Sequence, residues 1–369
     1  MKKIFYLIVL LGLFFLTGCG KNNQDTVFKD LTNKINKLNS YTLNGNLEIK
    51  NNNNTHTYNV KVNFMKNDKF KVALTNTSNN HEQVILRNDD GVFVLTPSLN
   101  KSFKFQSDWP YNNSQIYLLK SIVDDLNNDN TLTKSEENDK YIFISKVNYP
   151  NNNKLVKQKV TVTGDLQIEK VEVLNEKDEV EMTFTISSID YDPTFDEAYF
   201  EVNSIINTKS NDNTNTNKEN TTDKDKNNET NKEKNTETNK EENKKTETKT
   251  KETATLDDIV YPLYLPSGTV LDGQEKVSKT DGERVILTFK GEKGFTLVEE
   301  TATKEKELTI IPTYGEPSFV NDTIGAMTDN SLNWISNGIE YYIVSDVMNS
   351  QELLNIASSI DVKTVMNMK

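Results

Sequence analysis

The sequence contains very little cysteine or histidine. Its 369 residues include one cysteine, Cys19, and two histidines, His56 and His81, which lie in polar segments rich in asparagine. A single cysteine excludes an intrachain disulfide framework and a zinc site built from several cysteines. With so few metal-binding and catalytic side chains of these types, we expect neither a metal nor a cofactor.

An excess of positive charge is also missing. The chain has 43 lysines and arginines against 55 aspartates and glutamates, which gives a net charge of −12. Proteins that bind nucleic acid need clustered lysine and arginine, so we expect no nucleic-acid partner. Only 34% of the residues are hydrophobic. Part of the chain must therefore be too polar to pack into a core.

The N-terminus carries the first apolar run, which is too short to cross a bilayer. Ile4–Leu16 is 13 residues long, whereas a spanning helix needs about 20. This is the length of the hydrophobic region of a signal peptide. Leu16-Thr17-Gly18-Cys19 resembles the bacterial lipobox. That resemblance implies a lipoprotein with signal peptide 1–18, whose acylated Cys19 anchors it to the extracytoplasmic face of the cell membrane.

A long polar segment divides the rest of the chain. Residues 207–253 contain 11 lysines, 11 acidic residues and otherwise only asparagine, threonine and serine. Such a segment cannot bury enough apolar surface to offset the entropy of ordering. We therefore predict a folded domain at 19–206, a disordered linker at 207–254 and a small folded domain at 255–369. The linker should leave the second domain free to move relative to the first.

The first folded segment shows the patterns of an antiparallel sheet with two covering helices. Helical spacing of apolar residues predicts helices at 25–39 and 113–126. Alternation of apolar and polar residues between turn signals predicts about ten strands. The clearest are at 58–64, 70–74, 83–86, 92–95, 103–105, 141–147, 155–163, 166–174 and 180–186. Because two helices cannot cover so large a sheet, a concave apolar face should remain.

The second folded segment reads as a small α+β domain. Strands are predicted at 284–289, 295–299, 308–312, 331–335 and 341–344, the last two joined by an Asn-Gly turn. Ser350 is the expected N-cap of a final helix. The overall prediction is the α+β class: a curved antiparallel half-barrel with covering helices, a linker and this small domain.

Two stretches of the first segment resemble a known family. They are Leu95-Thr-Pro-Ser-Leu-Asn-Lys-Ser-Phe103-Lys-Phe105-Gln-Ser-Asp-Trp109-Pro and Phe195-Asp-Glu-Ala-Tyr-Phe200. Residues 25–201 resemble LolA-like lipoprotein carriers and RseB-type sensors, and most closely the YdcC-type and GerS-type lipoproteins of spore-forming bacteria. In the second segment, Leu332-x-Trp334 and the run from Glu352 to Ile360 fit the YdcC-type proteins.

The resemblance implies a non-catalytic scaffold for a lipid, an acyl chain or a partner protein. For the germination lipoproteins it implies work on spore-cortex peptidoglycan, partly by assisting an amidase, and it leaves a homodimer open. Phe103, Phe105 and Trp109 are the candidates for an apolar groove, although they could equally fill the core between sheet and helix.

Two further constellations are weaker. Asp125, Asn127, Asp129 and Glu136 have the spacing of a calcium-binding EF-hand loop, with Asn130 at the usual glycine, but the sequence that follows reads as a strand. The carboxylate pairs Asp257-Asp258 and Glu299-Glu300 could serve a glycosidase, although solvated surface charge is the simpler interpretation.

Three functions remain open. The first is a membrane-anchored, non-catalytic binding scaffold or carrier acting in sporulation, germination or envelope assembly. The alternatives are a peptidoglycan hydrolase and an extracellular envelope-stress sensor in which the second domain reads the signal.

Overall fold

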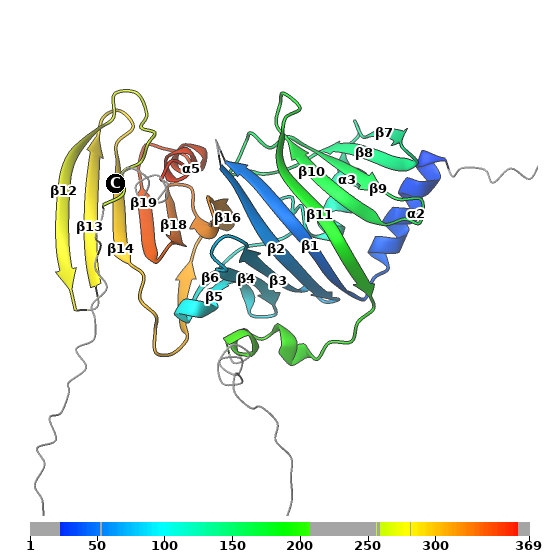
Figure 1. The fold of residues 1–369 in the computed structure, drawn as a ribbon, viewed down its shortest axis with the longest axis horizontal. Coiled ribbons are helices and arrows are strands. Elements are labelled where there is room, and N and C mark those ends of the chain that lie inside the picture. Colours follow the sequence, from blue (N-terminus) through cyan, green and yellow to red (C-terminus); the bar gives the residue numbers. More distant parts are fainter. Residues whose placement is uncertain (1–22, 52–53, 207–255, 257–258, 281, 361–369) are drawn as a thin grey trace, which may run out of the picture.

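The computed structural model describes residues 23–51, 54–206, 256, 259–280 and 282–360. The predicted signal peptide, the lipobox Leu16–Cys19, the linker 207–254 and Asp257-Asp258 lie outside the described residues. Within them the protein consists mostly of β-strands with few helices (Figure 1). The strands form two open sheets, in agreement with the predicted antiparallel sheet.

The first sheet has twelve strands in the described part of the chain. Their order across the sheet is β15-β6-β5-β4-β3-β2-β1-β11-β10-β9-β8-β7. All neighbours are antiparallel except β15 and β6. The bounds are β1 (Ser40–Asn51), β2 (Asn54–Met65), β3 (Lys69–Asn76), β4 (Glu82–Asn88), β5 (Gly91–Thr96), β6 (Lys101–Phe105), β7 (Thr133–Glu137), β8 (Lys140–Lys146), β9 (Lys157–Val162), β10 (Ile168–Leu174), β11 (Val180–Tyr191) and β15 (Thr309–Thr313).

The strand β1 was not predicted, although apolar and polar residues alternate along it. Gly45 interrupts the apolar series at the centre of the strand, where Leu43 and Leu47 are buried on either side. A Cβ at this glycine would lie 2.6 Å from the ring of Phe184 on β11. The glycine therefore permits the close packing of a bulky ring over the strand rather than marking a turn.

Two helices pack against the first sheet near β7 and β8 (Figure 1). The helix α2 (Gln24–Asn36) is capped by the Asn23 side chain and buries Val27, Leu31 and Ile35. The helix α3 (Leu119–Asn128) begins six residues later than predicted. The reason lies at Ser114, whose N–H donates to the carbonyl of Asn148 and whose hydroxyl accepts the N–H of Asn148, so this segment pairs with a loop instead of coiling.

The second sheet contains seven strands in the order β12-β13-β14-β19-β18-β17-β16. Their bounds are β12 (Val270–Lys279), β13 (Gly282–Lys290), β14 (Phe295–Thr301), β16 (Glu316–Val320), β17 (Thr323–Met327), β18 (Ser331–Ser336) and β19 (Ile339–Val344). The strands β12, β16 and β17 were not predicted. The helix α5 (Ser350–Ala357) packs on β18 and β19. Its N-cap is Asn349, not Ser350, because the Asn349 side chain accepts the N–H of Glu352 in a capping box.

The strand predicted at 308–312 does not belong to the second sheet. It forms β15, which adds to the outer edge of the first sheet in parallel with β6 (Lys101–Phe105). A parallel partner needs a long crossover, which the more than 200 residues between these strands provide. One element of the C-terminal part thus completes the N-terminal sheet.

The two parts are also joined by side chains, so the expectation of free movement is wrong for the described residues. Ile324 and Ala326 of β17 are buried in the main core of the first sheet. Lys101 forms an ion pair with Glu340 at 2.9 Å, with both side chains largely buried. The Tyr58 hydroxyl donates to the carbonyl of Asn321 at 3.2 Å. These contacts fix one sheet against the other.

Candidate functional site

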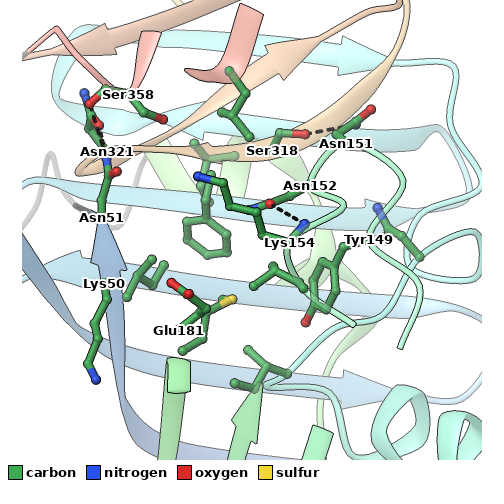
Figure 2. A pocket seen from close by; sticks show the side chains of 18 of the residues that line it. Lys50, Asn51, Tyr149, Asn151, Asn152, Lys154, Glu181, Ser318, Asn321 and Ser358 are labelled. Atoms are coloured by element: carbon green, nitrogen blue, oxygen red, sulfur yellow. Dashed lines mark hydrogen bonds between the residues drawn. The ribbon is translucent and has the colours of Figure 1, made fainter. Parts of the chain in front are cut away.

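A cleft of about 890 Å³ lies between the two parts of the molecule. Its N-terminal wall comes from the end of β1, the start of β11 and the loops at 109–117 and 149–155. Its C-terminal wall comes from β16, Asn321 and α5 (Figure 2). Both walls are necessary to define the space, so the site exists only where the two parts meet.

The floor of the cleft is apolar. It includes Ile85 on β4 and Ile116, both of which are otherwise buried in the core. Trp109 is held there from several sides: its ring meets Phe70 edge-on with centroids 6.0 Å apart, and its carbonyl accepts from the Arg87 guanidinium at 2.6 Å. These floor residues are therefore closely packed and offer no charge to a ligand.

The predicted groove residues are only partly at this site. Phe103, Phe105 and Trp109 are 7%, 2% and 1% exposed and all belong to the main core. Of the three, only Trp109 lines the cleft. The two phenylalanines are instead buried in the main core of the first sheet, and they do not line the cleft.

Polar side chains bridge the two walls at the rim. The Asn151 amide donates to the Ser318 hydroxyl at 3.2 Å, and the Asn153 N–H donates to the Gln351 side chain at 2.8 Å. Asn51 donates to Asn321 on the opposite wall. Figure 2 shows the first and last of these contacts at the upper edge of the cleft. The rim consists mainly of neutral amides and hydroxyls.

Four charged side chains line the mouth: Lys50, Lys154, Glu179 and Glu181. Their charges cancel, so the cleft does not select strongly for a charged ligand. The Asn175 amide donates to both carboxylates, at 2.8 Å to Glu179 and 2.6 Å to Glu181. This amide ties the two acids to the β10–β11 turn.

The carboxylate pair Glu299-Glu300 does not form a catalytic pair. Neighbouring residues of a strand point to opposite faces, and here the two lie apart on β14. Glu299 is buried and accepts the N–H of Val260 at 3.1 Å, while burial raises its pKa to about 7. Glu300 forms ion pairs with Lys279 and Arg284. Both glutamates therefore form stabilising contacts within the C-terminal part of the chain.

The residues with the spacing of a calcium-binding loop have other environments in the structure. Burial raises the pKa of Asp125 on α3 to about 7. Asp129 accepts from the N–H groups of Thr131 and Lys146, and Glu136 lies on β7. Among the described residues, no three histidine, cysteine, aspartate or glutamate side chains are grouped to hold a metal ion. Because β7 occupies the place of the second helix, the EF-hand arrangement does not form.

Sequence reasoning missed most of the cleft. Its C-terminal wall lies on β16, which was not predicted, and on α5, which was predicted as a helix without any part in a site. The Tyr149-Pro150-Asn151-Asn152 turn was a visible signal, but nothing local indicated which surface it would face. Surfaces built from segments about 170 residues apart have no local signature.

Comparison of the sequence with known families identifies the family. A sequence model of the family described as sporulation protein YdcC-like matches residues 1–200. The chain therefore belongs to the YdcC-like family. The sporulation protein YdcC of Bacillus subtilis (strain 168) is 33% identical over 362 residues, covering 97% of each chain.

Two solved structures give remote matches. The complex of Pseudomonas aeruginosa MucA and MucB matches with a TM-score of 0.28 and 11% identity, covering 90% of this chain and 98% of that one. The complex of the Clostridioides difficile CwlD amidase with the GerS lipoprotein matches with a TM-score of 0.27 and 18% identity, covering 49% of this chain and 100% of that one. Likenesses this distant carry no functional argument.

Within the described residues, no helix combines the length and the apolar character needed to cross a membrane.

Proposed function

We propose that this protein is a membrane-anchored, non-catalytic lipoprotein that holds a lipid or a partner protein in the cleft between its two sheets during sporulation or envelope assembly. The cleft carries the proposal: it has an apolar floor, a polar rim whose four charges cancel and walls from both ends of the chain. A site of this composition supports binding rather than bond cleavage.

The anchor follows from the lipobox, which leaves only residues 20–22 between Cys19 and the described start at Asn23. The four residue steps from Cys19 to Asn23 extend at most about 14 Å, so the first sheet would be held close to the bilayer. Kinship with the B. subtilis sporulation protein supports the biological setting. A peptidoglycan amidase is the partner protein that the resemblance to germination lipoproteins suggests.

A photo-crosslinking experiment in native membranes tests the proposal. A photoreactive amino acid replaces Asn152 at the cleft rim, and in a matched control it replaces Lys61, which is exposed on β2. We expect a discrete lipid or protein adduct from position 152 alone. The same adducts from both positions, or none from either, would contradict binding in the cleft. Clearing of peptidoglycan by the purified chain in a zymogram would support the hydrolase instead.

A further inference from the structure

The strand β16 presents an unpaired edge to the cleft. Within the described residues it is the last strand of the second sheet, with β17 on one side and no strand on the other. Pro317, Ser318 and Phe319 all line the cleft. Consecutive side chains point to opposite faces of a strand, so three in a row can line one space only if the strand's edge borders it.

The register shows which backbone groups that edge offers. A two-residue turn joins Val320 to Thr323, and the pair that flanks such a turn is hydrogen-bonded. The next pair, Phe319 and Ile324, is then non-hydrogen-bonded, so the backbone groups of each point away from the other. Ile324 confirms this, because its outward N–H and C=O both bond the Gln83 side chain. The N–H and C=O of Phe319 must therefore point outward toward the cleft.

Proline at 317 fits the same register. Two residues before Phe319, it also points its backbone away from β17. A proline there costs no bond within the sheet, because its missing N–H would have faced outward. The free edge thus offers the Pro317 carbonyl, the Phe319 N–H and the Phe319 carbonyl, which is the pattern that pairs with one extended strand.

We propose that the cleft binds an extended peptide segment, which adds to β16 as a further strand and places its apolar side chains on the floor. The inference rests on the proposed binding function and names its ligand class. β16 is five residues long, so the paired segment would span about 16 Å. Strand addition of this kind takes affinity from main-chain bonds and specificity from pockets for alternate side chains.

The walls favour a peptide over an acyl chain. Asn152 and Asn355 line the cleft together with the unpaired edge of β16. A hydrocarbon would take these polar groups out of water and return no hydrogen bond. A peptide backbone returns one at each residue, and its side chains can fill the space above Trp109 and Ile116.

Selection and substitution test the inference on residues 20–369. Random linear 12-residue peptides displayed on phage are selected on this chain, and the best is synthesised with a fluorescent label. Its affinity is compared by anisotropy for two variants, Phe319→Ala and Phe319→Pro. Both lack the ring, but only the proline variant lacks the outward N–H. We expect at least tenfold weaker binding to F319P than to F319A; equal affinities would overturn strand addition.

A second measurement does not depend on how the proline variant folds. Each amide of the selected peptide is N-methylated in turn and tested against the unaltered protein. Loss of binding at alternate amides supports pairing with β16, whereas uniform tolerance overturns it. If no peptide is selected but a dansyl-labelled fatty acid binds, the peptide inference fails and the binding function stands. If neither binds, both fail.

Discussion

The side-chain amide of Gln83 pairs with the backbone of Ile324 as a neighbouring strand would. Its nitrogen donates to the Ile324 carbonyl at 3.0 Å, and its oxygen accepts the Ile324 N–H at 2.6 Å. The same oxygen accepts the Thr323 hydroxyl at 2.9 Å. Gln83 lies on β4 of the first sheet and is 5% exposed. One buried amide thus couples the two parts of the molecule.

Removing that amide should weaken the whole fold. Gln83→Ala leaves the N–H and C=O of Ile324 and the Thr323 hydroxyl buried without this partner, so we expect a loss of about 2–4 kcal/mol in the free energy of unfolding. Urea denaturation measures it. The control is Gln106→Ala, at an exposed residue whose backbone N–H donates to the Thr313 carbonyl of β15 and is kept in the variant. Equal stabilities of the two variants would show that the coupling is negligible.

The two parts should stay together after the chain between them is cut. A specific protease site inserted after Lys226 allows cleavage without touching a described residue. Because β15 remains paired with β6 and Lys101 with Glu340, we expect both fragments to elute as one species in size-exclusion chromatography. Elution as two separate species would mean that these contacts do not hold the parts together.

Gly45 should tolerate no side chain. In Gly45→Ala the new Cβ would lie 2.6 Å from the Phe184 ring and 2.7 Å from the Thr185 carbonyl, and both belong to a central strand. We expect destabilisation of about 1–3 kcal/mol from overpacking. Gly164→Ala is the control, since nothing lies within 4 Å of its Cβ position. A thermal melt that fails to separate the two variants would refute the packing argument.

Glu299 should make stability depend on pH. Its pKa is about 7 in the folded protein and near 4.5 when exposed, because burial disfavours the charged form. The stabilising contribution of the protonated Glu299 to the folded state is therefore fully present below about pH 4.5. It is lost as the pH rises through 7, which lowers the free energy of unfolding by on the order of 3 kcal/mol. Glu299→Gln cannot ionise. We expect this variant to gain stability relative to the parent as the pH rises, as measured by melts at several pH values.

A stability difference between parent and Glu299→Gln that stays constant across that range would exclude titration of this carboxyl. The pKa of Asp125 is raised in the same way by burial, so Asp125→Asn provides an independent comparison on α3, which packs against the first sheet.

Sequence periodicity predicted the elements whose own residues show a regular apolar pattern. The alternation in β2 and β3 and the helical spacing of Leu31 and Ile35 reflect burial on one face, which depends on local sequence. The pattern failed at Gly45, where a long-range contact with Phe184 decides the residue. It also placed the strand predicted at 308–312 in the wrong sheet, because Ile310 and Ile311 indicate a strand but not its neighbour. The cleft could not be predicted for the same reason, because its two walls come from segments that are distant in the sequence.

The placement of β15 has a consequence for biosynthesis. A ribosome makes the chain from its N-terminus, so the first sheet is complete apart from one strand long before residue 309 exists. The β6 edge stays open throughout that interval, and the cleft gains its second wall only when α5 has been made. A shortened chain ending in the polar segment would keep a sheet and lose the binding space. The protein therefore cannot bind in the cleft until the chain has been synthesised through α5.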